Sequence, residues 1–471
     1  MYSTLRDVPH GLAEAGAASR PRRRRGAVGR VVLVLGLTSL LTDLSTEMVA
    51  AVLPLYLVLQ AGLSPFQFGV VNGLNQAATA PVRLISGVLA DRSARHREVA
   101  ATGYAMSAVS RIGLLAAGGS PGLIGGAIAV DRLGKGIRTA PRDAMLSLAT
   151  DQRALGTAFG VHRAMDTLGA MLGPVAAFGV LTAVAGGYDV VFVASAAIGA
   201  IGVAVLLLFT GRQPAAERRA PTVAPGGSLG ARPAVDLATA DAVAAPPASR
   251  GARARELAAL VVDPRLRRIL LAACVLALAT IGDAFLYLKL QRTLDLPVRL
   301  FPLLAAGTAA AYLLAALPVG VLADRVGRRR VLLGGHGCLL AAYLTLLSPL
   351  PPTAMLVTCL ALVGLYYAAA DGVLAALTSA ALPAGTRTTG LALVQTGVAL
   401  GQFTASVAAG ALWTAHGADT ALAAVAGALA VALAVAAWAL RQPRPGRTRA
   451  ARRRRNRHGG AALPHIGGGS P

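Results

Sequence analysis

Two carboxylates one helical turn apart, Asp43 and Glu47, interrupt a long apolar run near residues 31–59. A charge inside such a run is costly unless it faces a cavity or meets a partner of opposite charge. A carboxyl group buried with few partners also holds its proton more tightly, so that it can exchange protons near cellular pH. The pair therefore predicts a site of proton exchange. The alternative is a structural ion pair with a basic residue of a neighbouring helix.

A charged stripe crosses the apolar run near 121–147. Its residues are Asp131, Arg132, Lys135, Arg138, Arg142 and Asp143. Positions 131, 135, 138 and 142 recur at helical spacing, so they share one face of a helix. Because lipid cannot solvate charges, we expect this face to contact protein or water.

The apolar run near 155–184 carries His162, Arg163 and Asp166, with positions 162 and 166 one turn apart. An imidazole ionises near neutral pH and could relay protons, and a hydrogen-bonded structural histidine is the alternative. We expect the proton-exchanging residues to come from one set: Asp43, Glu47, Asp131, Asp166 and His162.

Away from the ends of the first six apolar runs, and without the cytoplasmic-end pair Arg142 and Asp143, basic residues outnumber acidic ones. The bases are Arg83, Arg111, Arg132, Lys135, Arg138 and Arg163, and the acids are Asp43, Glu47, Asp131 and Asp166. Since an uncompensated buried charge is expensive, we predict that a ligand with an anionic group supplies part of the compensation, near Arg132 and Arg83. The candidate anion-binding residues are Arg83, Arg132, Lys135, Arg138 and Arg163. A fully paired network would remove the basis of this prediction.

Other polar residues of the apolar runs could hydrogen-bond to a ligand inside an otherwise apolar cleft. They are Asn72, Asn75, Gln76, Tyr56, Tyr287 and Asp283. For Asn72 and its neighbours, hydrogen bonds between helices are the alternative. No cofactor or metal is expected, because the three cysteines lie in apolar runs without C-x-x-C spacing and no phosphate-binding loop is present.

The elements that must position these side chains are membrane helices. Of the 471 residues, 55% are hydrophobic and only 14% are charged, and the mean hydropathy is +0.61. This composition is far too apolar for an ordinary soluble protein. Twelve windows have the ~20 mostly apolar residues that cross a bilayer. They lie near 31–59, 67–90, 98–118, 121–147, 155–184, 188–210, 268–291, 299–323, 329–349, 353–380, 386–413 and 418–440.

The net charge of +24 reflects the distribution of 45 Lys and Arg residues. Most lie in the two tails and in alternate loops, which predicts cytoplasmic N- and C-termini. We expect a basic tail at 1–30, a six-helix bundle at 31–210, a cytoplasmic linker at 211–266, a second bundle at 267–440 and a basic disordered tail at 441–471. Anionic lipid is the expected partner of the basic tails, and nucleic-acid binding is not expected. The oligomeric state is open, with a monomer as the default.

An internal repeat relates the two halves. The letters G-V-L-A-D-R occur at Gly87–Arg92 and again at Gly320–Arg325, and other matches keep nearly the same spacing. Such parallel repeats are typical of transporters built from two similar bundles.

These loops resemble the G-x-x-x-D-R-x-G-R-R signature of the major facilitator superfamily. The second copy fits fully, with Gly320, Asp324, Arg325, Gly327, Arg328 and Arg329. The first copy has Gly87, Asp91 and Arg92 but departs from the signature at Ala94 and His96. Gly169, Gly173 and Pro174 resemble the start of a motif associated with antiporters, although Ala177 and Phe178 replace its closing glycines.

The resemblance covers about residues 31–440 and looks like a bacterial branch whose substrates are mostly unassigned. It implies an all-α membrane protein with twelve helices in two pseudo-symmetric six-helix bundles, located in the bacterial inner membrane. It further implies a secondary transporter that works by alternating access, with proton-coupled efflux of a small, anionic or amphiphilic solute as the leading mechanism. The alternatives are proton-coupled uptake of an organic anion and a receptor or scaffold that does not transport; no enzyme is expected. The signature residues are expected to form a gating clasp at the cytoplasmic end.

Overall fold

The computed structural model describes residues 29–78, 82, 96–150, 155–210, 263–382 and 387–441, and these form helices joined by short loops. The helices of the first half are α1 (Arg30–Leu55), its π-helical continuation η1 (Tyr56–Gln60), α2 (Pro65–Ala77), α4 (His96–Ala116), α5 (Pro121–Leu148), α6 (Leu155–Ala183) and α7 (Tyr188–Phe209). Those of the second half are α9 (Pro264–Leu278), α10 (Asp283–Leu294), the short η4 (Val298–Leu300), α11 (Pro302–Val326), α12 (Arg328–Leu346), α13 (Pro352–Ala381), α14 (Arg387–His416) and α15 (Ala418–Ala439). The predicted linker and the two tails lie almost entirely outside the described residues.

Proline marks where several helices begin. Pro65, Pro121, Pro264, Pro302 and Pro352 each occupy the first helical position of α2, α5, α9, α11 and α13. The missing N–H of proline costs nothing there, since the first turn has no acceptor for it. The sequence therefore fixes these helix starts locally.

Nine helical segments among the described residues are long and apolar enough to cross a membrane. Described helices also occupy the other three predicted windows. Of these, α2 has 13 described residues and α12 opens with three arginines, whereas α5 has 28 residues but contains the charged stripe. The predicted all-α membrane architecture is confirmed.

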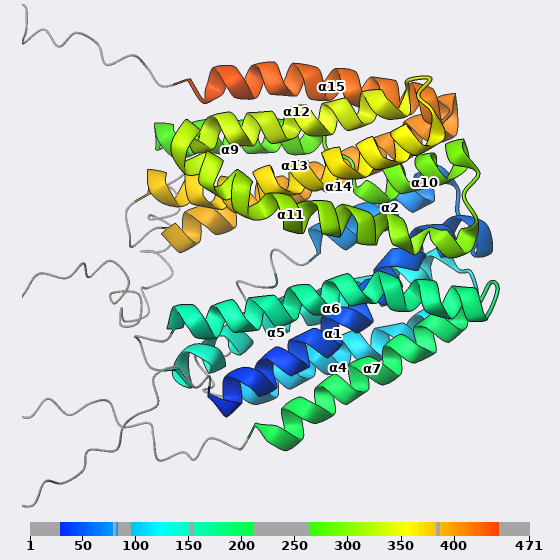
Figure 1. Ribbon diagram of the computed structural model, residues 1–471, viewed down its shortest axis with the longest axis vertical. Coiled ribbons are helices and arrows are strands. Elements are labelled where there is room, and N and C mark those ends of the chain that lie inside the picture. Colours follow the sequence, from blue (N-terminus) through cyan, green and yellow to red (C-terminus); the bar gives the residue numbers. More distant parts are fainter. Residues whose placement is uncertain are drawn as a thin grey trace, which may run out of the picture.

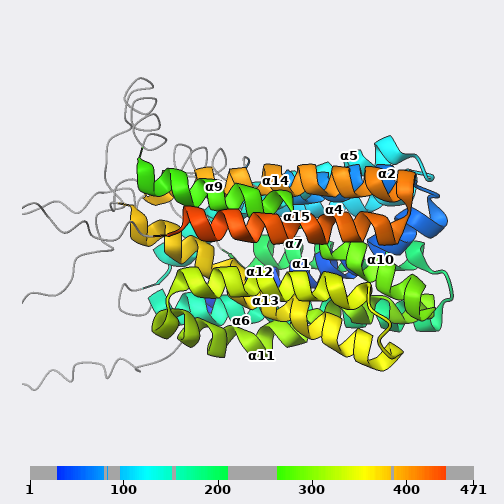
Figure 2. The same ribbon diagram turned by 90° about the horizontal axis from the view of Figure 1, so that it is seen from above.

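The helices run side by side between two ends (Figures 1 and 2). At one end α1 begins with Arg30, α12 begins with Arg328 and α15 gives way to Arg441; we call this the basic end, and the other the opposite end. Figure 1 shows α1, α4, α5, α6 and α7 grouped on one side and the helices from α9 to α15 on the other. The helix α2 belongs to the first half of the chain but lies on the side of the second group, where it packs against α14.

Large apolar side chains cover the outside of the molecule. Leu208, Leu314, Leu317 and Val431 are among the most exposed, with 76%, 80%, 80% and 65% of their surfaces accessible. A water-soluble protein would bury such residues, whereas lipid solvates them. The exposed surface therefore matches a membrane-embedded bundle.

Close packing of α2 on α14 joins the two groups toward the opposite end. A Cβ on Gly69 would lie 3.1 Å from the Cα of Gly410, so the two backbones touch. The amide of Phe66 donates to Oγ1 of Thr414 at 3.0 Å. These contacts hold the two groups together at this end.

Candidate functional site

Two cavities lie between the two groups of helices. One of about 580 Å³ is lined by α2, α5, α9, α12, α13 and α14, and one of about 520 Å³ is lined chiefly by α1, α2, α4, α5 and α10. Both volumes suit a small organic molecule. The two cavities adjoin, because they share Asn75, Gln76, Arg132 and Lys135 as lining residues.

The stripe of α5 divides into side chains that face the cavities and side chains that pair inside the first group. Arg132 and Lys135 line both cavities. Arg132 also lies 2.8 Å from Asp131, and Asp131 lies 2.6 Å from Arg111 of α4. One carboxylate therefore serves two guanidinium groups. Among the described residues, no carboxylate lies within 4.0 Å of Lys135.

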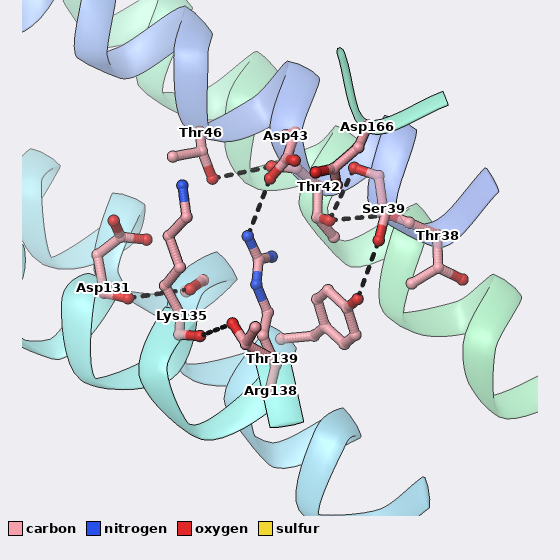
Figure 3. A network of polar contacts seen from close by, with 12 residues as sticks. Thr38, Ser39, Thr42, Asp43, Thr46, Asp131, Lys135, Arg138, Thr139 and Asp166 are labelled. Carbon is pink, nitrogen blue, oxygen red and sulfur yellow. Dashed lines mark hydrogen bonds and ion pairs between the residues drawn. The ribbon is translucent and has the colours of Figure 1, made fainter. Parts of the chain in front are cut away.

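Arg138 pairs with Asp43 of α1 (Figure 3). Nη2 of Arg138 donates to Oδ1 of Asp43 at 3.0 Å, and the guanidinium lies 4.7 Å from the centroid of the Tyr104 ring. Arg138 is 2% exposed and Asp43 is 9% exposed. The structural ion pair considered for Asp43 is thus present.

A second acid, Asp166 of α6, approaches the same place. Figure 3 shows its carboxyl group and that of Asp43 turned toward each other. Oδ1 of Asp166 is 3.6 Å from Nη1 of Arg142. Arg142 also binds Asp143 at 3.0 Å and donates to Oγ of Ser39 at 3.2 Å.

Glycines bring the charged helices together. A Cβ on Gly169 of α6 would collide with the backbone of Leu40 in α1, and one on Gly173 would lie 2.6 Å from the Cβ of Glu47. The antiporter-like glycines therefore allow α6 to pack directly on α1, while Pro174 lies within α6. Between α4 and α5, a Cβ on Gly103 would lie 2.6 Å from the carbonyl oxygen of Gly134. These contacts set Asp166 beside Asp43 and Arg111 beside Asp131.

The second half contributes a polar cluster at a break between α9 and α10. Asp283 opens α10 and lines the smaller cavity with Tyr287. Tyr367 of α13 lines the same cavity. A Cβ on Gly282 would lie 2.7 Å from the side-chain amide nitrogens of both Asn72 and Gln76. Irregular backbone is tolerated at membrane depth when it lies inside protein or beside a cavity.

The remaining candidates occupy varied places. Glu47 lines the smaller cavity. Asn72 donates to Ser406 of α14 at 3.0 Å, which is the interhelical bond considered for it. Tyr56 packs its ring edge-on against Tyr188 and Phe192 and lines neither cavity. Arg83 lies outside the described residues.

Two residues of α6 differ from their expected surroundings. Arg163 is exposed and lines neither cavity. His162 is 3% exposed, and within the described part of the chain neither ring nitrogen has a hydrogen-bond partner. The alternative considered for His162, a hydrogen-bonded structural histidine, is therefore not found among the described residues.

The second signature loop lies at the basic end. Gly327 joins α11 to α12 with φ at 102°, a conformation that favours glycine. Arg328 donates to the carbonyl of Ala376 in α13 at 3.1 Å and lies 3.7 Å from Asp324. Asp324 and Arg325 are exposed, Arg329 is half-buried, and Gly320 has open space around it. The first copy, with Gly87, Asp91 and Arg92, falls outside the described residues.

Several residues that line the larger cavity escaped the sequence analysis. Gln395 and Gln402 of α14 lie two turns apart and both face it, as do His336 and Thr378. The seven-residue spacing of the two glutamines was the one available signal. An isolated polar residue such as His336 has no such spacing, so the sequence does not show which face of its helix it occupies.

Family comparison agrees with this architecture. The family model described as Major Facilitator Superfamily matches residues 35–311 and 284–466. The chain belongs to the major facilitator superfamily. The predicted resemblance is therefore confirmed, and the chain is a multi-pass secondary transporter rather than an enzyme.

Individual relatives are more distant. An uncharacterized MFS-type transporter of Methanocaldococcus jannaschii is 26% identical over 396 residues, which cover 81% of this chain and 88% of the relative. The nucleoside transporter NupG, in a crystal structure of its D323A mutant, aligns with a TM-score of 0.71 at 15% identity over 87% of this chain and 100% of that one. A bacterial homologue of the human lysosomal transporter Spinster, inward-facing and unoccupied, aligns with a TM-score of 0.64 at 17% identity over 87% and 96%. At these identities the solved structures show a shared fold alone.

Proposed function

We propose that this superfamily member is a proton-coupled transporter of a small solute with an anionic group. One observation carries the proposal: among the described residues that line the larger cavity there are two long basic side chains, Arg132 and Lys135, and no carboxylate. The facing wall is neutral, with Gln395, Gln402 and Thr378. A cavity with two cations and a hydrogen-bonding wall suits an anion.

The charge balance supports the same conclusion. Asp131 divides its two oxygens between Arg111 and Arg132, so one negative charge serves two positive ones. Lys135 has no described carboxylate within ion-pair distance. A cation at membrane depth without an ion-pair partner is costly, and a bound anion would offset part of that cost.

The sidedness follows from the distribution of basic residues. We place the basic end in the cytoplasm, together with both termini, since Lys and Arg are retained on that side. The larger cavity is lined by the parts of α12, α13 and α14 nearer the basic end, while α2 and α14 close the opposite end. The conformation is then inward-facing, in the plasma membrane of a bacterium. Transport requires the bundles at 31–210 and 267–440 to rock about the cavity.

Export against inward proton movement is the proposed direction. The support is the glycine motif at Gly169 and Gly173, which resembles the antiporter motif and packs α6 against α1. Proton-coupled uptake is the second candidate, and the position of Lys135 favours it. An anion bound at Lys135 would neutralise this lysine and weaken its stabilisation of nearby carboxylates. Those carboxyl groups would then bind a proton more readily, so anion and proton would favour each other's binding.

Flux into proteoliposomes under an imposed pH gradient tests the proposal. The solutes are a panel of mono- and dicarboxylates, phosphate esters, organic cations and lipophilic amphiphiles. We expect anion flux that follows the gradient, reduced at least about tenfold in Arg132→Ala, since a charged hydrogen bond contributes roughly 1.5–3 kcal/mol. Arg268→Ala, exposed on α9 and outside both cavities, is the matched control. Flux confined to cations, or equal anion flux in Arg132→Ala, would contradict the proposal.

A further inference from the structure

We infer that Asp43 and Asp166 together hold one transported proton between their carboxyl groups, and that Lys135 links this proton site to the solute cavity. The inference rests on the proposed function and assigns its proton site. The site joins α1 to α6 within one group of helices rather than lying across the cavity (Figure 3).

The two carboxyl groups can share one proton. Figure 3 shows them turned toward each other, and an ionised carboxylate is only an acceptor. A hydrogen bond between them therefore needs one protonated partner. Two ionised carboxylates in that arrangement would also repel each other strongly.

The surrounding charges can accommodate both protonation states. From α5, Arg138 contacts Asp43 at 3.0 Å and Arg142 lies 3.6 Å from Asp166, with Lys135 nearby. The other ionisable groups nearby are Asp143 of α5 against Arg142, Tyr104 of α4 against Arg138, His162 of α6 and Glu47 one turn along α1, whereas Arg163 is exposed. Three cations around two carboxyls stabilise the pair whether it carries one negative charge or two. A proton carrier needs this property, because it must both load and release.

Lys135 is placed to connect proton and solute. It lines both cavities, and Figure 3 shows its side chain extending from α5 toward Asp43 and Thr46. Its charge acts on Asp43 and Asp166 alike. Glu47 is the rival proton site, since it lines the smaller cavity itself and the charge of Lys135 acts on it as well.

Infrared difference spectroscopy of the purified protein, taken from acidic to alkaline buffer, tests the carboxyl pair without a solute. We expect a protonated-carboxyl band that titrates in the wild type, disappears in Asp43→Asn and in Asp166→Asn, and persists in Glu47→Gln. A band that survives in both aspartate variants, or disappears in Glu47→Gln alone, would overturn the assignment. Circular dichroism and size-exclusion profiles identify any variant that has failed to fold, and Asp166→Glu, which keeps a carboxyl, should retain the band.

The link through Lys135 is tested by the same titration. Removing this cation should favour the protonated pair, because a nearby positive charge favours the ionised form of a carboxyl group. The midpoint of the band in Lys135→Met should therefore move to higher pH by about tenfold or more in proton concentration. Lys289→Met is the control, because Lys289 pairs with Asp419 at 2.7 Å elsewhere. An unchanged midpoint in Lys135→Met would refute the link.

Transport separates this inference from the proposed function. Asp166→Asn should lose flux driven by a pH gradient while it retains exchange of labelled for unlabelled solute without a gradient. Gradient-driven flux in Asp166→Asn equal to that of the wild type would overturn the proton assignment alone. Wild-type flux that ignores the gradient would instead refute proton coupling, and with it both proposals.

Discussion

At the residue scale, the buried charges are organised as pairs that share one helix, α5. The sequence could predict that residues 131, 135, 138 and 142 lie on one face, because helical spacing alone decides this. It could not predict that Arg138 meets Asp43 or that Arg111 meets Asp131, because spacing along one helix says nothing about which neighbour packs against it. The ion pair considered for Asp43 is present, with Arg138 at 3.0 Å, and the proton site at Asp43 stays a proposal.

Removing one partner of the Arg138–Asp43 pair should lower the stability of the folded protein. Arg138→Met leaves Asp43 without its closest cation, and breaking a buried pair costs about 3–5 kcal/mol. We expect a clear loss of thermal stability in detergent, measured by the unfolding midpoint. Asp43→Asn combined with Arg138→Met should recover part of it, because no uncompensated charge then remains. Equal stability of Arg138→Met and wild type would show that other cations already balance Asp43.

At the element scale, the lengths of the apolar runs and the positions of proline predict most of the helices. Contacts between helices determine the features that these patterns miss. The window near 268–291 reads as one span, yet α9 ends at Leu278 and α10 begins at Asp283. No proline marks this break. It is stabilised by a tertiary contact, since the amide of Ile281 donates to the hydroxyl of Tyr343 at 3.2 Å. The packing of α2 on α14 was equally beyond local sequence patterns.

Two glycines of α6 should respond differently to the same substitution. Gly169→Ala forces a methyl group against the backbone of Leu40, so α6 must move away from α1. We expect lower thermal stability by about 1–3 kcal/mol and reduced transport. Gly179→Ala has open space around its Cβ and should gain up to roughly 1 kcal/mol from the better helix propensity of alanine. The unfolding midpoints of the two variants in detergent test this difference. A Gly169→Ala variant as stable as the wild type would contradict the proposed close packing.

At the scale of the whole molecule, the repeat and the signature loops indicated two related halves and a membrane transporter, and the family comparison confirms the transporter. The conformation could not be read from the sequence, since both states of an alternating-access protein use the same residues. It depends on which end is held together, and Phe66, Gly69, Gly410 and Thr414 hold the opposite end.

A reversible cross-link at the opposite end should arrest transport. Cysteines replacing Phe66 and Thr414, whose backbone and side chain are 3.0 Å apart in the wild type, would bridge α2 and α14 after oxidation. We expect flux in proteoliposomes to stop on oxidation and to return with a reducing agent. Either cysteine alone is the control. Full flux through the oxidised pair would mean that this end does not need to open.

The most direct test of the central claim is the proton movement that accompanies solute movement. Proteoliposomes with a pH-sensitive dye inside are exposed to an anion that the flux screen identifies, with no imposed gradient. We predict an interior pH change in the wild type, towards acid for uptake with protons and towards alkali for exchange against them, and none in Arg132→Ala. Anion entry in the wild type without any change of interior pH would contradict the account.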